Sequence, residues 1–291
     1  MIGMPIKEAT DWDALDTAFR AEQGADLDIA HAHLLSQTQA AAAGRRILLQ
    51  ALHLERHANA LDIGTGFGPV AFELAGLGVG AVTGVDNDTL CVETARRIAV
   101  SLRNWLPEGA SVAFEEADGA SLPFGDASFD LVTSFLLYQH ISDPRAVTAE
   151  AWRVLCSGGL FCVAEVDNGL AVVYPETSAA ASKLEAAYDA LYEKRLGDRL
   201  VGRKLSTYLD NQGFSIEAVL VLPNAAHGPS RRNDFGRQMD LERLMLERDG
   251  IVSQGIMSAD ELNDALAVYA DEEASARFRL ETLIAVVGRK P

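Results

Sequence analysis

Hydrophobic and polar positions follow two different periods along this chain of 291 residues. In residues 1–58, the segment "DLDIAHAHLLSQTQAAAAGRRILLQALHLER" places apolar residues at helical spacing, and we expect two or three helices there. From Ala60 onward, short apolar runs alternate with amphipathic stretches, as in "ALDI" followed by "GPVAFELAGL". The alternation recurs in "AVTGVD" followed by "DTLCVETARRIAVSLRNWL". This pattern predicts a mostly parallel, doubly wound α/β sheet.

Turn and cap residues divide the second half of the chain. Asp143 and Pro144 predict a helix start, because aspartate caps helices and proline suits their first turn. Gly158 and Gly159 predict the end of that helix before a strand at "LFCVAEV". We then expect helices near "ETSAAASKLEAAYDALYEKR" and "GRKLSTYLDNQ" and a strand at "FSIEAVLVL". A mostly helical interval, in which "SADE" at 258–261 matches a capping box, precedes the last strand "LETLIAVVGRK".

We therefore expect a single domain over residues 1–291, built on a seven-stranded, Rossmann-like sheet. Its predicted parts are a helical N-terminal cap at 1–58, a sheet core at 59–223, a helical insertion at 224–276 and a final strand at 277–291. The sequence contains neither an internal repeat nor a Gly/Ser linker that would indicate a second domain.

Charge and composition limit the cellular location and the binding partners that we expect for this protein. A net charge of −17 disfavours nucleic acid as a partner. No apolar run is long enough to span a bilayer, and the N-terminus lacks the apolar region of a signal peptide, so we expect a cytoplasmic protein without a membrane partner. Cys91, Cys156 and Cys162 lie in apolar-patterned segments without a CxxC pair, so we interpret all three as core residues and predict no metal site. A homodimer is compatible with the sequence.

The stretch "ALDIGTGFGPVAFELA" holds glycines where a strand passes into a helix, which is a place where parallel sheets bind nucleotides. From Gly66, "GFGPVA" satisfies the G-x-G-x-x-A form of a dinucleotide-binding loop, and Asp86 follows 20 residues later to bind a ribose. From Asp62, the same stretch is D-x-G-x-G-x-G, and its early carboxylate suits a cationic ligand such as a sulfonium better than a pyrophosphate.

Five segments favour the second interpretation. "ALDIGTGFG", "VTGVDND", "EEADGASLPF", "FDLVTSFLLYQHISDP" and "AWRVLCSGGLFCVAEVD" resemble, in order and spacing, the class I S-adenosylmethionine-dependent methyltransferases. The sequence looks most like the bacterial group that includes ubiquinone- and menaquinone-biosynthesis enzymes. The resemblance covers roughly residues 45–167, and it implies S-adenosyl-L-methionine as cofactor and methyl transfer to a small-molecule substrate.

The resemblance also implies a role for individual residues. Glycines of the loop would approach the methionine and ribose, Asp86 would accept hydrogen bonds from the ribose hydroxyls, and residues after the second and third strands would frame the adenine. The implied cofactor-binding residues are Asp62, Gly64, Gly66, Gly68, Asp86, Asn87, Asp118, Gly119, Ser134 and Phe135, with Arg45, Arg46 or Gln39 near the cofactor carboxylate. Asp62 has an equally good structural interpretation, as an anchor of the glycine loop.

The substrate and any catalytic base are less well marked. Tyr138 and His140 in "LLYQHISDP" follow the fourth strand and are the candidate bases, whereas His31 and His33 are interpreted as packing residues. "SFLLYQ" lacks the Asn/Asp-Pro-Pro-Tyr sequence of enzymes that methylate DNA bases or glutamine, which favours a small organic acceptor. Arginines in "EKRLGDRLVGRK" and "GPSRRNDFGR" form salt bridges or, if they line the pocket, indicate an anionic acceptor.

Two other functional classes stay open at this point. A dinucleotide-dependent oxidoreductase is supported by "GFGPVA" but opposed by Asp118 and the later segments. A protein of this fold that binds a ligand or catalyses another reaction without methylating is compatible with the same motifs.

Overall fold

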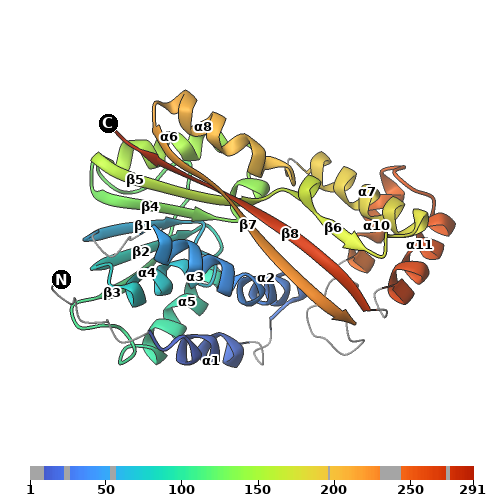
Figure 1. Cartoon of the computed structure of the whole chain (residues 1–291), viewed down its shortest axis with the longest axis horizontal. Helices are drawn as coiled ribbons and strands as arrows, with labels where there is room; N and C mark the ends of the chain where they lie inside the picture. The colour runs from blue at the N-terminus through green and yellow to red at the C-terminus, as the bar shows by residue number, and fades with distance from the viewer. Residues whose placement is uncertain (1–9, 23–26, 53–56, 196, 230–243, 273–275) are drawn as a thin grey trace, which may run out of the picture.

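The computed structural model describes residues 10–22, 27–52, 57–195, 197–229, 244–272 and 276–291. Eight strands in these residues form one sheet (Figure 1). They are β1 (Asn59–Ile63), β2 (Ala81–Asp86), β3 (Ser111–Glu116), β4 (Phe129–Phe135), β5 (Leu155–Val166), β6 (Val172–Tyr174), β7 (Ser215–Pro229) and β8 (Ala276–Arg289).

The sheet has the order β3-β2-β1-β4-β5-β8-β6, and β7 pairs with β8. Strands β1 to β5 run parallel to one another. Strand β8 runs antiparallel to β5, β6 and β7. The predicted α/β, mostly parallel, Rossmann-like sheet is confirmed. The strand order reverses between β1 and β4, and ligands of such sheets bind at the carboxyl ends of the strands beside that point.

Three sequence-based predictions about the strands are wrong. The described sheet has eight strands instead of seven, because the short β6 pairs with residues 278–280 of β8. Strand β5 begins at Leu155 and not after the glycines, since Gly158 continues the strand with a φ of 79°. Residues 224–229, predicted as helical insertion, extend β7 because β8 supplies pairing partners along its length. Residues 230–243, in the middle of the predicted insertion, lie outside the described part of the chain.

The described residues form ten α-helices. They are α1 (Trp12–Glu22), α2 (Ile29–Ala40), α3 (Ala42–Ala51), α4 (Pro69–Leu77), α5 (Thr89–Ser101), α6 (Pro144–Val154), α7 (Ala179–Lys194), α8 (Leu205–Gln212), α10 (Arg248–Ser253) and α11 (Ala259–Glu272). Two predicted helix starts are confirmed. Asp143 accepts hydrogen bonds from the first turn of α6, and Ser258 and Glu261 bond reciprocally at the start of α11. None of the described helices is long and apolar enough to cross a membrane.

The helices form three packing groups. Helices α1 to α5 contribute to the hydrophobic core on one face of the sheet, and α6 and α8 cover the other face. The third group is a small cluster formed by α7, α10 and α11, which lies at one end of the molecule in Figure 1. Cys91 and Cys162 are buried core residues as predicted. The prediction for Cys156 is wrong, because its side chain is only partly buried at the start of β5.

Candidate cofactor-binding site and adjoining pocket

The glycine loop bends tightly between β1 and α4. Gly64, Gly66 and Gly68 have positive φ angles of 73°, 53° and 87°, a conformation that other residues rarely adopt. Backbone N–H groups of Gly64 and Thr65 both donate to the carbonyl of Val85, at 2.9 Å, which ties the loop to the end of β2. The loop therefore holds its backbone close to the carboxyl end of β2.

Asp86, the last residue of β2, is joined to the same loop. Its Oδ2 accepts a hydrogen bond from the Gly66 N–H at 2.8 Å, and its Oδ1 accepts one from the Asp88 N–H at 3.0 Å. Burial raises the pKa of the Asp86 carboxyl, and the two backbone hydrogen bonds partly oppose that shift. A carboxylate has about four lone-pair sites, so each oxygen keeps capacity for a ligand hydroxyl.

Asp62 holds the glycine loop in place through side-chain hydrogen bonds. Its carboxylate is 1% exposed and accepts hydrogen bonds from the hydroxyls of Thr65 at 2.6 Å and Thr133 at 2.8 Å. Burial raises the pKa of Asp62 to about 7. The geometry gives Asp62 a structural role in fixing the loop to β4, and its contact with a ligand stays a prediction.

The residues predicted to frame an adenine meet at the ends of β2 and β3. The Ala117 N–H donates to the Asp86 carbonyl at 2.9 Å, so Asn87 and Asp118 follow neighbouring strand ends, and both are exposed. Asp118 turns the chain by accepting from the Ala120 N–H at 2.9 Å. A Cβ at Gly119 would lie 2.8 Å from Ile63 Cγ2, so only glycine fits against β1. The structure thus brings these residues together beside Asp86.

The end of β4 separates the glycine loop from a pocket. Ser134 is fully buried, and its hydroxyl has no hydrogen-bond partner in the described structure, while Phe135 is half-buried. Leu136 follows with a φ of 59° and lines the pocket. The next side chain, Leu137, points the other way, because a Cβ at Gly64 would lie 2.9 Å from it. Two consecutive leucines therefore face the loop and the pocket.

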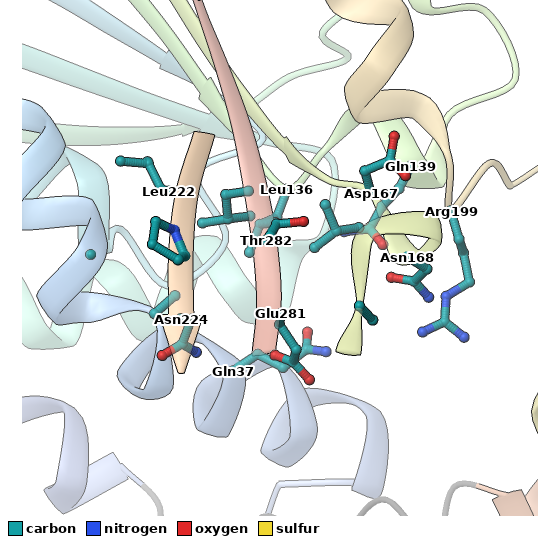
Figure 2. Close-up of a pocket in the computed structure, with 16 residues that line it drawn as sticks. Gln37, Leu136, Gln139, Asp167, Asn168, Arg199, Leu222, Asn224, Glu281 and Thr282 are labelled. Carbon is teal, nitrogen blue, oxygen red and sulfur yellow. The ribbon is translucent and has the colours of Figure 1, made fainter. Parts of the chain in front are cut away.

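The pocket has a volume of about 170 Å³ and draws its walls from distant parts of the chain (Figure 2). Gln37 comes from α2, Gly44 from α3 and Leu222 from β7. Strand β8 contributes Glu281 and Thr282. The hydroxyl of Thr282 is buried without a hydrogen-bond partner in the described structure, so the wall offers a polar group with unused bonding capacity.

The polar side of this pocket follows β5. Asp167 is 1% exposed and its carboxylate binds the guanidinium of Arg203, which lowers the pKa of Asp167 despite the opposing effect of burial. The ion pair gives Asp167 a structural role at the end of β5. Arg199 also lines the pocket, but its charge is paired with Asp189 at 2.8 Å. The pocket therefore gives no clear preference for an anionic acceptor.

The prediction that Tyr138 acts as a base is wrong. Its side chain is fully buried against α6, its hydroxyl lies 2.9 Å from Thr148 Oγ1, and burial raises its pKa. A buried phenol that is hydrogen-bonded away from the pocket cannot reach a substrate. His140 is exposed, and its Nδ1 contacts the hydroxyl of Tyr192 on α7. A catalytic role of His140 stays a prediction.

Arg45 lies in a buried ion pair instead of an open position. Its Nε and Nη2 donate to Glu73 of α4 at 2.6 and 2.8 Å, and its Nη1 donates to the Thr38 carbonyl at 3.1 Å. Arg46 shares Glu73 and also binds Asp16. These contacts fasten the N-terminal cap to α4, and a ligand contact of Arg45 remains only a prediction.

Sequence reasoning missed most of the pocket wall. Gln37, Asn224, Glu281 and Thr282 come from segments that show no motif, and only their arrival at one place gives them a candidate role. Thr282 carried a weak signal, as a polar residue inside the apolar last strand.

Comparison with known proteins places residues 61–163 in the family of the methyltransferase domain. An uncharacterised 37.1 kDa protein of Streptomyces fradiae transposon TN4556 is 28% identical over 75% of this chain and 61% of its own length. The demethylmenaquinone methyltransferase of Thermus thermophilus is 37% identical over 36% of this chain and 46% of its own length. An O-methyltransferase of Penicillium expansum is 36% identical over 36% of this chain and 37% of its own length. Each match thus spans less than two thirds of the relative.

Two solved structures share the fold at low sequence identity. The YcgJ protein of Bacillus subtilis aligns with a TM-score of 0.53 and 18% identity, over 86% of this chain and 99% of that one. A putative methyltransferase of Bacillus halodurans aligns with a TM-score of 0.52 and 19% identity, over 80% and 92% of the two chains. Residues 61–163 therefore match a methyltransferase domain, and the strand order and the glycine loop of the chain agree with that match.

Proposed function

We propose that this protein transfers a methyl group from S-adenosyl-L-methionine to a small organic acceptor. The observation that carries the proposal is the position of Leu136 and Leu137. One side chain lines the pocket and the other packs on the glycine loop, so the pocket adjoins the expected cofactor site. An acceptor in the pocket would lie next to a cofactor on the loop.

The residues at the loop fit this cofactor. The Asp86 carboxylate offers acceptors for ribose hydroxyls, and the exposed carboxylate of Asp118 can accept from the exocyclic amine of adenine. A Cβ at Gly66 would meet only Leu34, at 3.7 Å, so the backbone there is open to close approach by a ligand. When bound, S-adenosyl-L-methionine supplies a methyl group on a positively charged sulfur. The net charge of −17 on the chain favours binding of such a cation.

The protein's part in the reaction is mainly alignment and exclusion of water. Positioning the acceptor in line with the methyl group supplies much of the acceleration, and a base is needed only if the acceptor must lose a proton. Gln139 and Thr282 line the pocket and can orient an acceptor by hydrogen bonds. Leu136 and Leu222 supply apolar walls. The acceptor atom, a homodimer and a cytoplasmic location stay open predictions.

Binding of S-adenosylhomocysteine tests the cofactor. Calorimetry with the wild-type protein should show micromolar or tighter binding and a higher melting temperature, since a ligand of the folded state stabilises it. Asp86→Ala should weaken binding by about 2 to 4 kcal/mol, because it removes a charged acceptor. Asp86→Asn keeps an acceptor for the Gly66 N–H and should lose less.

The surface variant Asp249→Ala, on the exposed start of α10, is the matched control and should bind like the wild type. Binding of NAD(H) without binding of S-adenosylhomocysteine would instead support the oxidoreductase. Binding of S-adenosylhomocysteine, with no methyl transfer from labelled cofactor to any acceptor in a metabolite extract, would support the fold as a non-methylating protein.

A further inference from the structure

His31, Asp88 and Cys91 meet where the cap helix α2 reaches the N-terminal end of α5. One potential ligand atom from each side chain lies within 4.8 Å of the other two, and His31 Nε2 is 3.0 Å from Asp88 Oδ2. In a tetrahedral zinc site, bonds of about 2.0 to 2.3 Å place the ligand atoms roughly 3.5 Å apart. We propose that these three side chains form a Zn²⁺ site, with a water molecule completing the coordination.

The ligand set matches the chemistry of zinc. Zn²⁺ binds imidazole nitrogen, thiolate sulfur and carboxylate oxygen, and a thiolate ligand selects against Mg²⁺ and Ca²⁺. The thiol of Cys91 is free and 2% exposed, and no hydrogen bond to it is found in the described residues. This unpartnered, buried thiol points into the group formed with His31 and Asp88.

A second carboxylate, that of Asp28, contacts the other ring nitrogen of His31. His31 Nδ1 lies 2.8 Å from Asp28 Oδ1, on the side of the ring opposite to Asp88. Metal-binding histidines commonly present their other ring nitrogen to a carboxylate, which fixes the tautomer and the ring orientation. Asp28 would therefore position the imidazole ring, and His31 would bind the metal through Nε2.

The local charge also favours a cation. The carboxylates of Asp28, Asp86 and Asp88 all lie close enough to Cys91 to interact with it electrostatically. Their negative charge would attract a divalent cation, and binding of the cation to the thiol would release the thiol proton.

The site would connect the cap to the glycine loop. His31 belongs to α2, and its ring packs edge-on against Phe67 of the loop, with 6.4 Å between ring centroids. Asp88 is the N-cap of α5 and lies two residues after Asp86. A metal ion held by both helices would therefore hold α2 over the loop. The metal site itself does not depend on the proposed methyl transfer.

Titration of the untagged, metal-free chain with Co²⁺ and Zn²⁺ tests the proposal. We expect one Co²⁺ per chain, a near-ultraviolet thiolate-to-cobalt absorption band, and loss of that band when Zn²⁺ is added. Cys91→Ser should abolish the band, and His31→Gln and Asp88→Asn should weaken binding at least tenfold. Asp28→Asn should weaken it about tenfold as a positioning residue, while asparagine keeps the helix cap.

Cys156→Ser is the matched control, because this partly buried cysteine lies in β5 and outside the group. It should keep the band and the wild-type affinity, and circular dichroism should show that all variants are folded. Absence of the band in the wild type, or its persistence in folded Cys91→Ser, would overturn the proposal.

Discussion

Glu165 places a carboxyl group fully inside the protein near the end of β5, where it accepts a hydrogen bond from the backbone N–H of Tyr138. Its second oxygen is buried without a hydrogen-bond partner in the described structure. Burial raises the pKa of Glu165 to about 8, although backbone N–H groups act in the opposite direction. The native state therefore holds a proton that the unfolded chain, with a pKa of 4.5, releases.

This raised pKa predicts a pH-dependent stability. Between about pH 4.5 and pH 8 the native state binds more protons at this site than the unfolded state, so the free energy of unfolding falls as pH rises. Each such proton changes it by about 1.4 kcal/mol per pH unit. Glu165→Gln should reduce the loss of stability between pH 5 and pH 8, as measured by urea unfolding.

Asp62, whose pKa is raised to about 7, contributes in the same direction, so the variant should keep part of the dependence. Glu108→Gln, on the exposed surface, is the control and should retain the wild-type slope. Equal slopes for Glu165→Gln and the wild type would show that Glu165 is ionised in the native protein.

Among the elements, α2 contacts the glycine loop, whereas α10 and α11 pack in a separate cluster. Leu34 of α2 is the nearest contact to the Cβ position of Gly66, and Arg45 of the following α3 binds Glu73 of α4. Helices α10 and α11 pack instead with α7 in a separate cluster. Within the described residues, α2 therefore lies against the glycine loop, whereas α10 and α11 pack elsewhere.

Hydrogen exchange should separate these elements. We expect S-adenosylhomocysteine to slow amide exchange in α2, because a ligand on the loop adds contacts beneath that helix and suppresses its local opening. Exchange in α10 and α11 should not change with this ligand alone. Helix α8, on the opposite face of the sheet, is the internal reference. Uniform protection of α2, α8, α10 and α11 would point to global stabilisation and contradict a local cover.

At the scale of the whole molecule, the pocket exists only because α3, β7 and β8 converge beside the end of β4. Gly44 of α3 lines it, and a Cβ at this position would meet no described heavy atom within 4 Å beyond its chain neighbours and the backbone of its own helix. Gly44→Leu should fill part of the pocket. We expect at least a tenfold loss of methyl transfer to an acceptor found by screening with labelled cofactor, with unchanged affinity for S-adenosylhomocysteine.

Gly44→Ala provides the matched control, since a methyl group leaves most of the pocket open. It should keep activity and stabilise the protein by roughly 0.5 to 1 kcal/mol, because alanine is favoured over glycine inside a helix. Full activity of a folded Gly44→Leu variant would show that the acceptor binds elsewhere.

Local chemistry in the sequence determined the parallel core and the loop. The alternation of strand and helix patterns predicted β1, β2 and the helices α4 and α5 that follow them, and the glycine spacing predicted the bend that the positive φ angles confirm. These features were readable because they depend on neighbours in sequence: side-chain periodicity, helix caps and the conformational freedom of glycine. The position of Asp86 at the end of β2 follows from the same pattern.

Tertiary structure decided whatever depends on partners far along the chain. Residues 224–229 became strand because β8 offers them hydrogen-bond partners, and Tyr138 became a core residue because α6 covers it. His31 meets Asp88 and Cys91 across more than fifty residues of sequence, so no local spacing could reveal the group. The sequence pattern shows which residues can form an element, whereas burial, pairing and charge contacts depend on how the elements pack together.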